Sequence, residues 1–96
     1  MSHLQEVELH HGEEVFKLKP THKALYKCLK NPALNGRLAL LAVELEQMNI
    51  ELMHEVLKHF SNDKRSVIEL LELDISLTKL ATAIGESLQL LMAERD

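Results

Sequence analysis

Apolar residues in the C-terminal part of the chain recur at steps of three and four. From residue 76 onward they occupy Leu77, Leu80, Ala81, Ile84, Leu88, Leu91 and Met92. This spacing places the side chains on one stripe of an α-helix. It predicts a helix over about residues 76–94, the longest in the chain. Because an apolar stripe is unfavourable in water, the rest of the chain or a partner must cover it.

The same period predicts four earlier helices, over about residues 21–31, 36–48, 50–60 and 66–73. Thr21 and Asn49 have side chains that cap the start of a helix well. Ser66, followed three residues later by Glu69, fits a capping box. These caps indicate where three of the helices begin.

The helix expected over residues 36–48 differs from the others because it is apolar on several sides. One stripe consists of Leu38, Leu41, Ala42 and Leu45. Leu40 and Val43 widen this stripe, which predicts a helix that is buried on more than one side.

Alternating apolar and polar residues over residues 6–19 predict a β-hairpin around Gly12. If the numbers of paired residues sum to 25, apolar pairs lie on one face and opposite charges pair on the other. The pairs are then Val7–Leu18, Leu9–Phe16, Glu6–Lys19 and Glu8–Lys17. This register leaves His11–Glu14 as the loop. Two strands alone are only marginally stable, so helices must cover the apolar face.

Composition agrees with a mainly helical (α+β) fold. Apolar residues make up 46% of the chain and aromatic residues only 3%. An apolar share rich in leucine favours helices over sheets. We therefore expect one domain over residues 1–96, with a short N-terminal β-hairpin packed on a compact bundle of four to five helices.

The net charge of −4 argues against a general nucleic-acid binder, which normally carries a basic surface. The charge is unevenly distributed, because residues 17–43 hold six basic residues and no acidic residue. This segment either complements acidic residues elsewhere in the chain or forms a patch for an acidic partner.

The sequence also bears on compartment. The single cysteine, Cys28, excludes an internal disulfide and fits a reducing environment. The N-terminus has no basic and apolar signal pattern, and no window approaches eighteen uncharged apolar residues. These features predict a cytoplasmic protein that is not inserted in a membrane.

Residues capable of chemistry do not fall into a recognisable catalytic pattern. His10 and His11 are adjacent on a strand and point to opposite faces, while His54 and His59 are five apart on a helix. Cys28 lies on an apolar face, where a thiol is more often inert than nucleophilic. We therefore predict no catalytic residue, no metal site and no cofactor.

Two patterns are candidates for binding a protein partner. One is a lysine stripe at i, i+4 and i+7 on the helix over residues 21–31. The other is the end of the C-terminal apolar stripe, which could pack on another copy of the chain or on a partner helix. The candidate residues are Lys23, Lys27, Lys30, Leu88, Leu91 and Met92.

The segment from Leu80 to Leu88 allows an alternative. An alanine-rich helix that ends at Gly85 before a second helix is typical of a helix-turn-helix. The expected recognition helix, residues 88–96, offers one arginine and two acids, which is poor for phosphate contact.

The order of elements resembles that of small tail proteins from phages and gene transfer agents. These proteins open with a hairpin around a Gly-Glu or Asn-Gly turn, and a Pro-Thr step then leads into a helix that has Ala-Leu near its start. Residues 7–21, with Gly12-Glu13 and Pro20-Thr21, and then Ala24-Leu25 fit this opening. The later helices are similar to Leu38–Leu45, Ile50–Phe60 and Leu77–Met92.

This resemblance implies a tail assembly chaperone in the cytoplasm of a bacterial host. Such proteins are non-enzymatic and bind helical segments of a tape-measure or tail-tube protein through apolar helical surfaces. The alternatives are a small helix-turn-helix regulator and a phage-encoded inhibitor of a host protein. For the inhibitor, the acidic residues that would mimic phosphate are Glu44, Glu46, Glu51 and Glu55.

Overall fold

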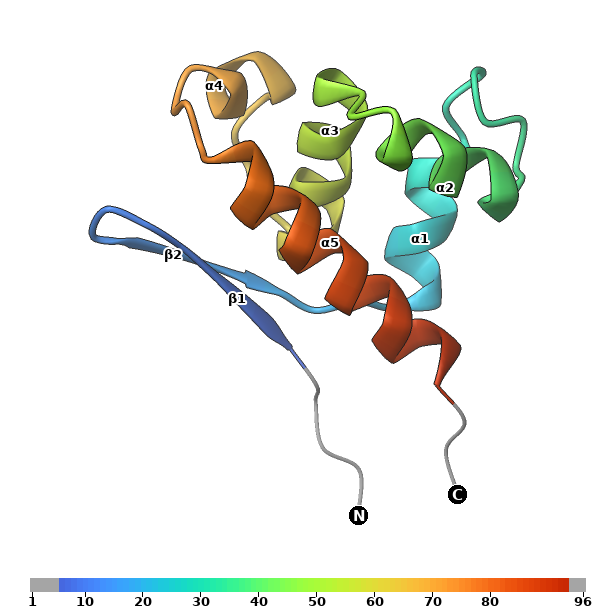
Figure 1. Ribbon diagram of the computed structural model, residues 1–96, viewed down its shortest axis with the longest axis horizontal. Helices are drawn as coiled ribbons and strands as arrows, with labels where there is room; N and C mark the ends of the chain where they lie inside the picture. Colours follow the sequence, from blue (N-terminus) through green and yellow to red (C-terminus); the bar gives the residue numbers. More distant parts are fainter. Residues whose placement is uncertain (1–5, 94–96) are drawn as a thin grey trace.

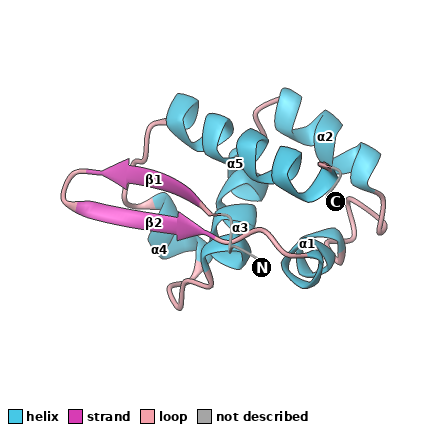
Figure 2. Ribbon diagram, turned by 90° about the horizontal axis from the view of Figure 1, so that it is seen from below, coloured by secondary structure: helices cyan, strands magenta, loops and turns pink. Residues whose placement is uncertain are grey.

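The computed structural model describes residues 6–93 and shows a two-stranded antiparallel hairpin followed by five helices (Figure 1). The elements are β1 (Val7–His11), β2 (Glu14–Leu18), α1 (His22–Leu29), α2 (Leu38–Glu46), α3 (Ile50–Ser61), α4 (Val67–Leu71) and α5 (Leu77–Met92). The predicted fold class, a hairpin packed on a helical bundle, is confirmed. The hairpin lies at one end of the molecule, with α1 and α2 at the other (Figure 2).

The hairpin has the predicted register, in which Leu9 pairs with Phe16 and Glu8 with Lys17. The loop is shorter than predicted, because His11 and Glu14 also pair and only Gly12 and Glu13 connect the strands. Gly12 has a φ of +60°, which is the conformation that type II′ turns require at their first central position. Glycine adopts this conformation without steric cost, and the turn therefore fits in two residues.

Helix α3 forms the centre of the core and packs against α1, α2, α4, α5 and β2. Its buried side chains are Leu52, Met53, His54, Val56, Leu57 and Phe60. The predicted Asn49 cap is present, with the Asn49 side chain accepting a hydrogen bond from the Leu52 amide at 3.1 Å. His54 was not predicted to be buried. Its ring tolerates burial because Nδ1 donates to the Ile50 carbonyl at 2.8 Å.

Helix α5 is the longest helix, as predicted, and it packs on α3 and β1 (Figure 1). Its buried residues include Leu80 and Ile84 from the predicted stripe. The buried Ser87 hydroxyl donates to the Ala83 carbonyl at 2.8 Å, so this polar side chain is satisfied inside the helix. The helix ends at Met92, and the predicted range to residue 94 is too long because Ala93 is already extended; residue 94 itself lies outside the described residues.

Three other predicted helices also extend too far at their ends. The first ends at Leu29, and α2 spans Leu38–Glu46 instead of residues 36–48. The chain leaves the helical conformation at Gly36 and Met48, which have φ values of +74° and +58°. The Ser66–Glu69 capping box is present, but α4 ends at Leu71 and not at residue 73.

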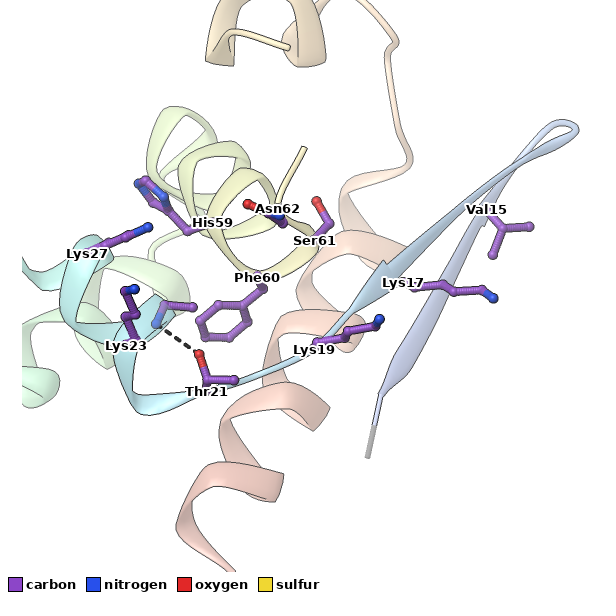
Figure 3. Close-up of a pocket in the computed structure, with 11 residues that line it drawn as sticks. Val15, Lys17, Lys19, Thr21, Lys23, Lys27, His59, Phe60, Ser61 and Asn62 are labelled. Carbon is purple, nitrogen blue, oxygen red and sulfur yellow. Dashed lines mark hydrogen bonds between the residues drawn. The ribbon is translucent and has the colours of Figure 1, made fainter. Parts of the chain in front are cut away.

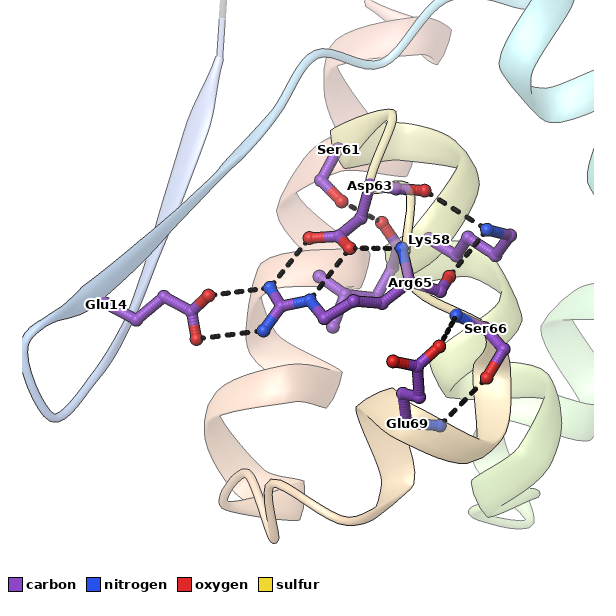
Figure 4. A network of polar contacts seen from close by, with 8 residues as sticks. Glu14, Lys58, Ser61, Asp63, Arg65, Ser66 and Glu69 are labelled. Carbon is purple, nitrogen blue, oxygen red and sulfur yellow. Dashed lines mark hydrogen bonds and ion pairs between the residues drawn. The ribbon is translucent and has the colours of Figure 1, made fainter.

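The tip of the hairpin is fastened to the connection between α3 and α4 by Arg65 (Figure 4). Its guanidinium donates two hydrogen bonds to the Glu14 carboxylate, at 2.6 and 3.3 Å. It donates two more to the Asp63 carboxylate, at 2.8 and 2.9 Å, and lies 5.2 Å from the centre of the Phe16 ring. The hydrogen bonds from Arg65 hold the pKa of the Asp63 carboxyl below its ordinary value.

Candidate functional site

Basic side chains line a groove of about 620 Å³ between β2 and α1, with the C-terminal end of α3 between them (Figure 3). Lys17 and Lys19 come from the β2 side, and Lys23 and Lys27 come from α1. The remaining lining residues are Val15, Thr21, Ala24, His59, Phe60, Ser61 and Asn62. No carboxylate is among these lining residues. We call this feature the basic groove.

Two local features of the sequence shape the basic groove. The Thr21 side chain accepts a hydrogen bond from the Ala24 amide at 3.0 Å, and α1 therefore begins at His22, two residues after Pro20. The Lys19 amide donates to the Phe60 carbonyl at 2.8 Å, which holds the end of β2 against α3. Together they place the lysines of α1 on the opposite side of the groove from those of β2 (Figure 3).

The groove is electropositive and its lysines are not neutralised within residues 6–93. The ion pairs of this region join His10 to Glu8 and Arg65 to Glu14 and Asp63, and none includes a groove lysine. Glu8 pairs with Lys17 in the strand register, but its carboxylate contacts His10 at 3.3 Å instead.

His59 lies partly buried beside these lysines. Burial lowers its pKa, Lys27 and Lys58 lower it further, and Glu55 opposes them. The neutral imidazole is therefore favoured in the folded protein, and most of the positive charge in the groove comes from lysine.

The predicted lysine stripe is only partly brought into this groove. Lys23 and Lys27 line it, whereas Lys30 is outside the lining and its ammonium lies 5.0 Å from the centre of the Tyr26 ring. Sequence reasoning did not single out Lys17, Lys19 or His59 as site residues. The signal that could have found the two lysines is the acid-free segment over residues 17–43.

A second candidate surface lies on α2. The prediction that this helix is buried on more than one side is wrong, because Leu41 is its only fully buried residue. Leu40 is 36% exposed and Val43 is 46% exposed. Among residues 6–93, helix α2 packs mainly on α3, and one side of it stays exposed. The exposed apolar residues in and just after α2, which we call the α2 apolar face, are Ala39, Leu40, Ala42, Val43, Met48 and Ile50. Ala42 was predicted on the inner stripe, and its exposure contradicts that prediction.

The α2 apolar face has a polar and acidic border. Glu46, Gln47 and Glu51 are exposed beside it. Glu44 and Glu55 have intramolecular partners, since they accept hydrogen bonds from the side-chain amides of Asn49 at 2.7 Å and Asn31 at 3.5 Å. The acids suggested for an inhibitor of a host protein are thus divided between exposed and internally bonded positions.

The other predicted partner-binding residues lie at the end of α5. Leu88 and Leu91 are partly buried and pack against the core, whereas Met92 is 70% exposed. Most of the α5 stripe is therefore covered within the chain, and Met92 is the predicted residue of this helix that remains available to a partner.

The helix-turn-helix alternative requires a turn at Gly85. Helix α5 continues through Gly85 to Met92 without interruption, so this turn is absent. A close helix contact does not explain the glycine either, because a Cβ built at Gly85 would have no neighbouring atom within 4 Å. The glycine carries no structural requirement in this fold.

Cys28 is fully buried, and burial raises the pKa of its thiol to about 12. The reactive thiolate is therefore scarce near neutral pH. Within residues 6–93, histidine, cysteine and carboxylate side chains form no group of three or more that could hold a metal ion. No helix in this part of the chain is long and apolar enough to cross a bilayer.

Comparisons of the chain with models of protein families, with curated proteins and with solved structures gave no match.

Proposed function

We propose that this protein is a non-enzymatic tail assembly chaperone that holds an apolar helical segment of a tape-measure protein on the α2 apolar face. The observation that carries this proposal is the exposure of Leu40, Val43, Met48 and Ile50 by 36–46%. A cluster of exposed apolar side chains on a small protein marks a place where a partner binds. The resemblance of the hairpin, the Pro-Thr step and the helix order to phage tail proteins supports this class of partner.

The shape and border of the face favour a helical segment. The nine residues of α2 span about 13 Å, which matches two to three turns of a partner helix. Exposed Glu46 and Glu51 beside the face favour a helix that has lysine or arginine next to its apolar stripe. A tape-measure segment with this pattern would be kept in solution because its apolar stripe is covered.

Co-expression with the tape-measure protein of the same phage or prophage tests the proposal. We expect the wild-type chain to keep the long protein soluble and to copurify with it. The double substitution Leu40→Asp and Val43→Asp places two charges in the face, so both effects should disappear. Ile68→Asp is the control for placing a charge on an exposed apolar residue elsewhere, because Ile68 is 69% exposed on α4, outside this face.

Circular dichroism would establish that both variants remain folded. Equal solubilisation by the double variant and by wild type would overturn the proposal. A second copy of the chain is the competing occupant of the face. If the double variant changes a dimer into a monomer in light scattering and still binds the tape-measure protein, then the face serves self-association and the proposal fails.

A further inference from the structure

The outer edge of β2 faces the basic groove. In an antiparallel pair, the N–H groups of one strand point alternately to the partner strand and to the outer edge. The Lys19 N–H points to the outer edge, because it donates to the Phe60 carbonyl at 2.8 Å. The N–H of Lys17, two residues earlier, therefore points to the same edge. Within residues 6–93, it makes no backbone hydrogen bond outside the strand ladder.

The side chains along this edge repeat with the period of a strand. Lys17 and Lys19 are two residues apart and exposed, so both lie on the solvent side of the hairpin. Lys23 and Lys27 are one helical turn apart and line the opposite side of the groove (Figure 3). A ligand in the groove would thus have cationic side chains on both sides. The open strand edge beside it ends before Lys19, whose N–H is bonded to Phe60.

We propose that the basic groove binds a short acidic segment of another protein, which adds to the open edge of β2 as an extended strand. The main chain of the segment would bond to the edge, as in β-strand addition. Carboxylates at every second position would lie beside Lys17 and Lys19, as opposite charges do across neighbouring strands. The lysines on α1 would contact carboxylates on the far side.

The lining favours a peptide over a single-stranded nucleic acid. Nucleic acids without defined sequence are held by arginines and by exposed aromatic rings on which the bases stack. Within the described part of the chain, no arginine lines the groove, and the aromatic ring that does, Phe60, is only 1% exposed. The net charge of −4 would also repel a long polyanion outside the groove.

This inference does not rest on the proposed function, because the basic groove and the α2 apolar face share no residue. The two proposals can therefore fail separately. The Leu40→Asp and Val43→Asp variant should bind the acidic peptide as wild type does. A groove variant should still keep a tape-measure protein soluble.

The test uses the full chain and a fluorescein-labelled ten-residue peptide of alternating threonine and glutamate. Fluorescence anisotropy at low ionic strength should show saturable binding that weakens as salt is added. Replacing both Lys23 and Lys27 with glutamine should weaken binding by about tenfold. Lys30→Gln with Lys64→Gln is the control, because it removes the same charge outside the groove and should change the affinity by less than about twofold.

Three further results would overturn the inference or part of it. Equal losses of peptide affinity in the groove variant and in the control variant would show that binding depends only on the net charge of the protein. Equal affinity for a peptide with alternate amides N-methylated would show that the β2 edge does not pair with the ligand. Tighter binding of a ten-nucleotide single strand than of the peptide would identify a nucleic acid as the ligand. All variants replace exposed side chains, and circular dichroism would verify their fold.

Discussion

The Arg65 contacts predict that the hairpin tip stabilises the whole fold. Arg65→Met removes hydrogen bonds to Glu14 and Asp63 and the contact with the Phe16 ring. The arginine side chain is 32% exposed, so each ion pair is worth at most about 1 kcal/mol. Two ion pairs and one cation–π contact together give a loss of about 2 kcal/mol. In a domain of this size, that loss lowers Tm by about 10 °C.

Urea unfolding followed by circular dichroism measures this loss. A double-mutant cycle with Glu14→Gln isolates the bond to the hairpin, and we expect a coupling energy of about 0.5–1 kcal/mol. Lys64→Met is the control, because Lys64 is exposed and adjacent in sequence, and it should change stability by less than about 0.5 kcal/mol. A coupling energy near zero, with Arg65→Met no more destabilising than the control, would show that the Arg65 contacts do not stabilise the fold.

Acid titration of stability gives an independent check on the same contacts. The pKa of Asp63 is lowered in the folded protein, so the ionised carboxylate contributes to folding stability at pH values above its ordinary pKa of 3.8. This stability contribution is lost as the pH falls through the lowered pKa of the folded protein. In Arg65→Met the carboxyl returns towards its ordinary pKa, because its main hydrogen-bond donor is gone. This part of the acid dependence should therefore disappear in the variant.

Three further predictions concern the core, the buried thiol and the partly buried imidazole. Leu80→Ala should cost about 2–5 kcal/mol in urea unfolding because Leu80 is fully buried, whereas Leu40→Ala on the exposed face should cost less than about 1 kcal/mol. Cys28 should react with a thiol reagent only as fast as the protein opens, and rapidly in denaturant, because it is buried and its pKa is raised. The pKa of His59 is lowered, so the unfolded chain takes up its proton first and stability should fall as the pH drops below about 6.5. His59→Gln should remove that loss in unfolding midpoints measured at about pH 7.5 and about pH 5.5.

Features that depend on residues close together in the sequence were predictable. The strand register follows from the alternation between Val7 and Leu18, since a shift by one residue would expose every apolar side chain of a strand. The Asn49 cap and the Ser66–Glu69 box are formed by side chains within three residues of the amides they bind.

The candidate sites were less predictable because they combine distant segments. Lys23 and Lys27 were found as a stripe on one helix, but their position opposite Lys17 depends on how β2 packs against α3. His54 has its hydrogen-bond partner four residues away, yet only its place on the central helix buries it. A hydrophobic pattern shows which residues share one face of a helix or strand. It does not show which other element, if any, packs against that face.

Residue patterns alone predict the hairpin, its register, the order of the helices and most of their caps. These features follow from backbone preferences and side-chain periodicity over a few residues. The packing of the elements on one another determines which apolar side chains remain in contact with water and which charged side chains share a groove. Leu40 and Leu41 are adjacent and chemically identical, yet Leu41 is fully buried and Leu40 is 36% exposed. The reason is that burial depends on which elements pack around a helix, and α2 packs mainly on α3.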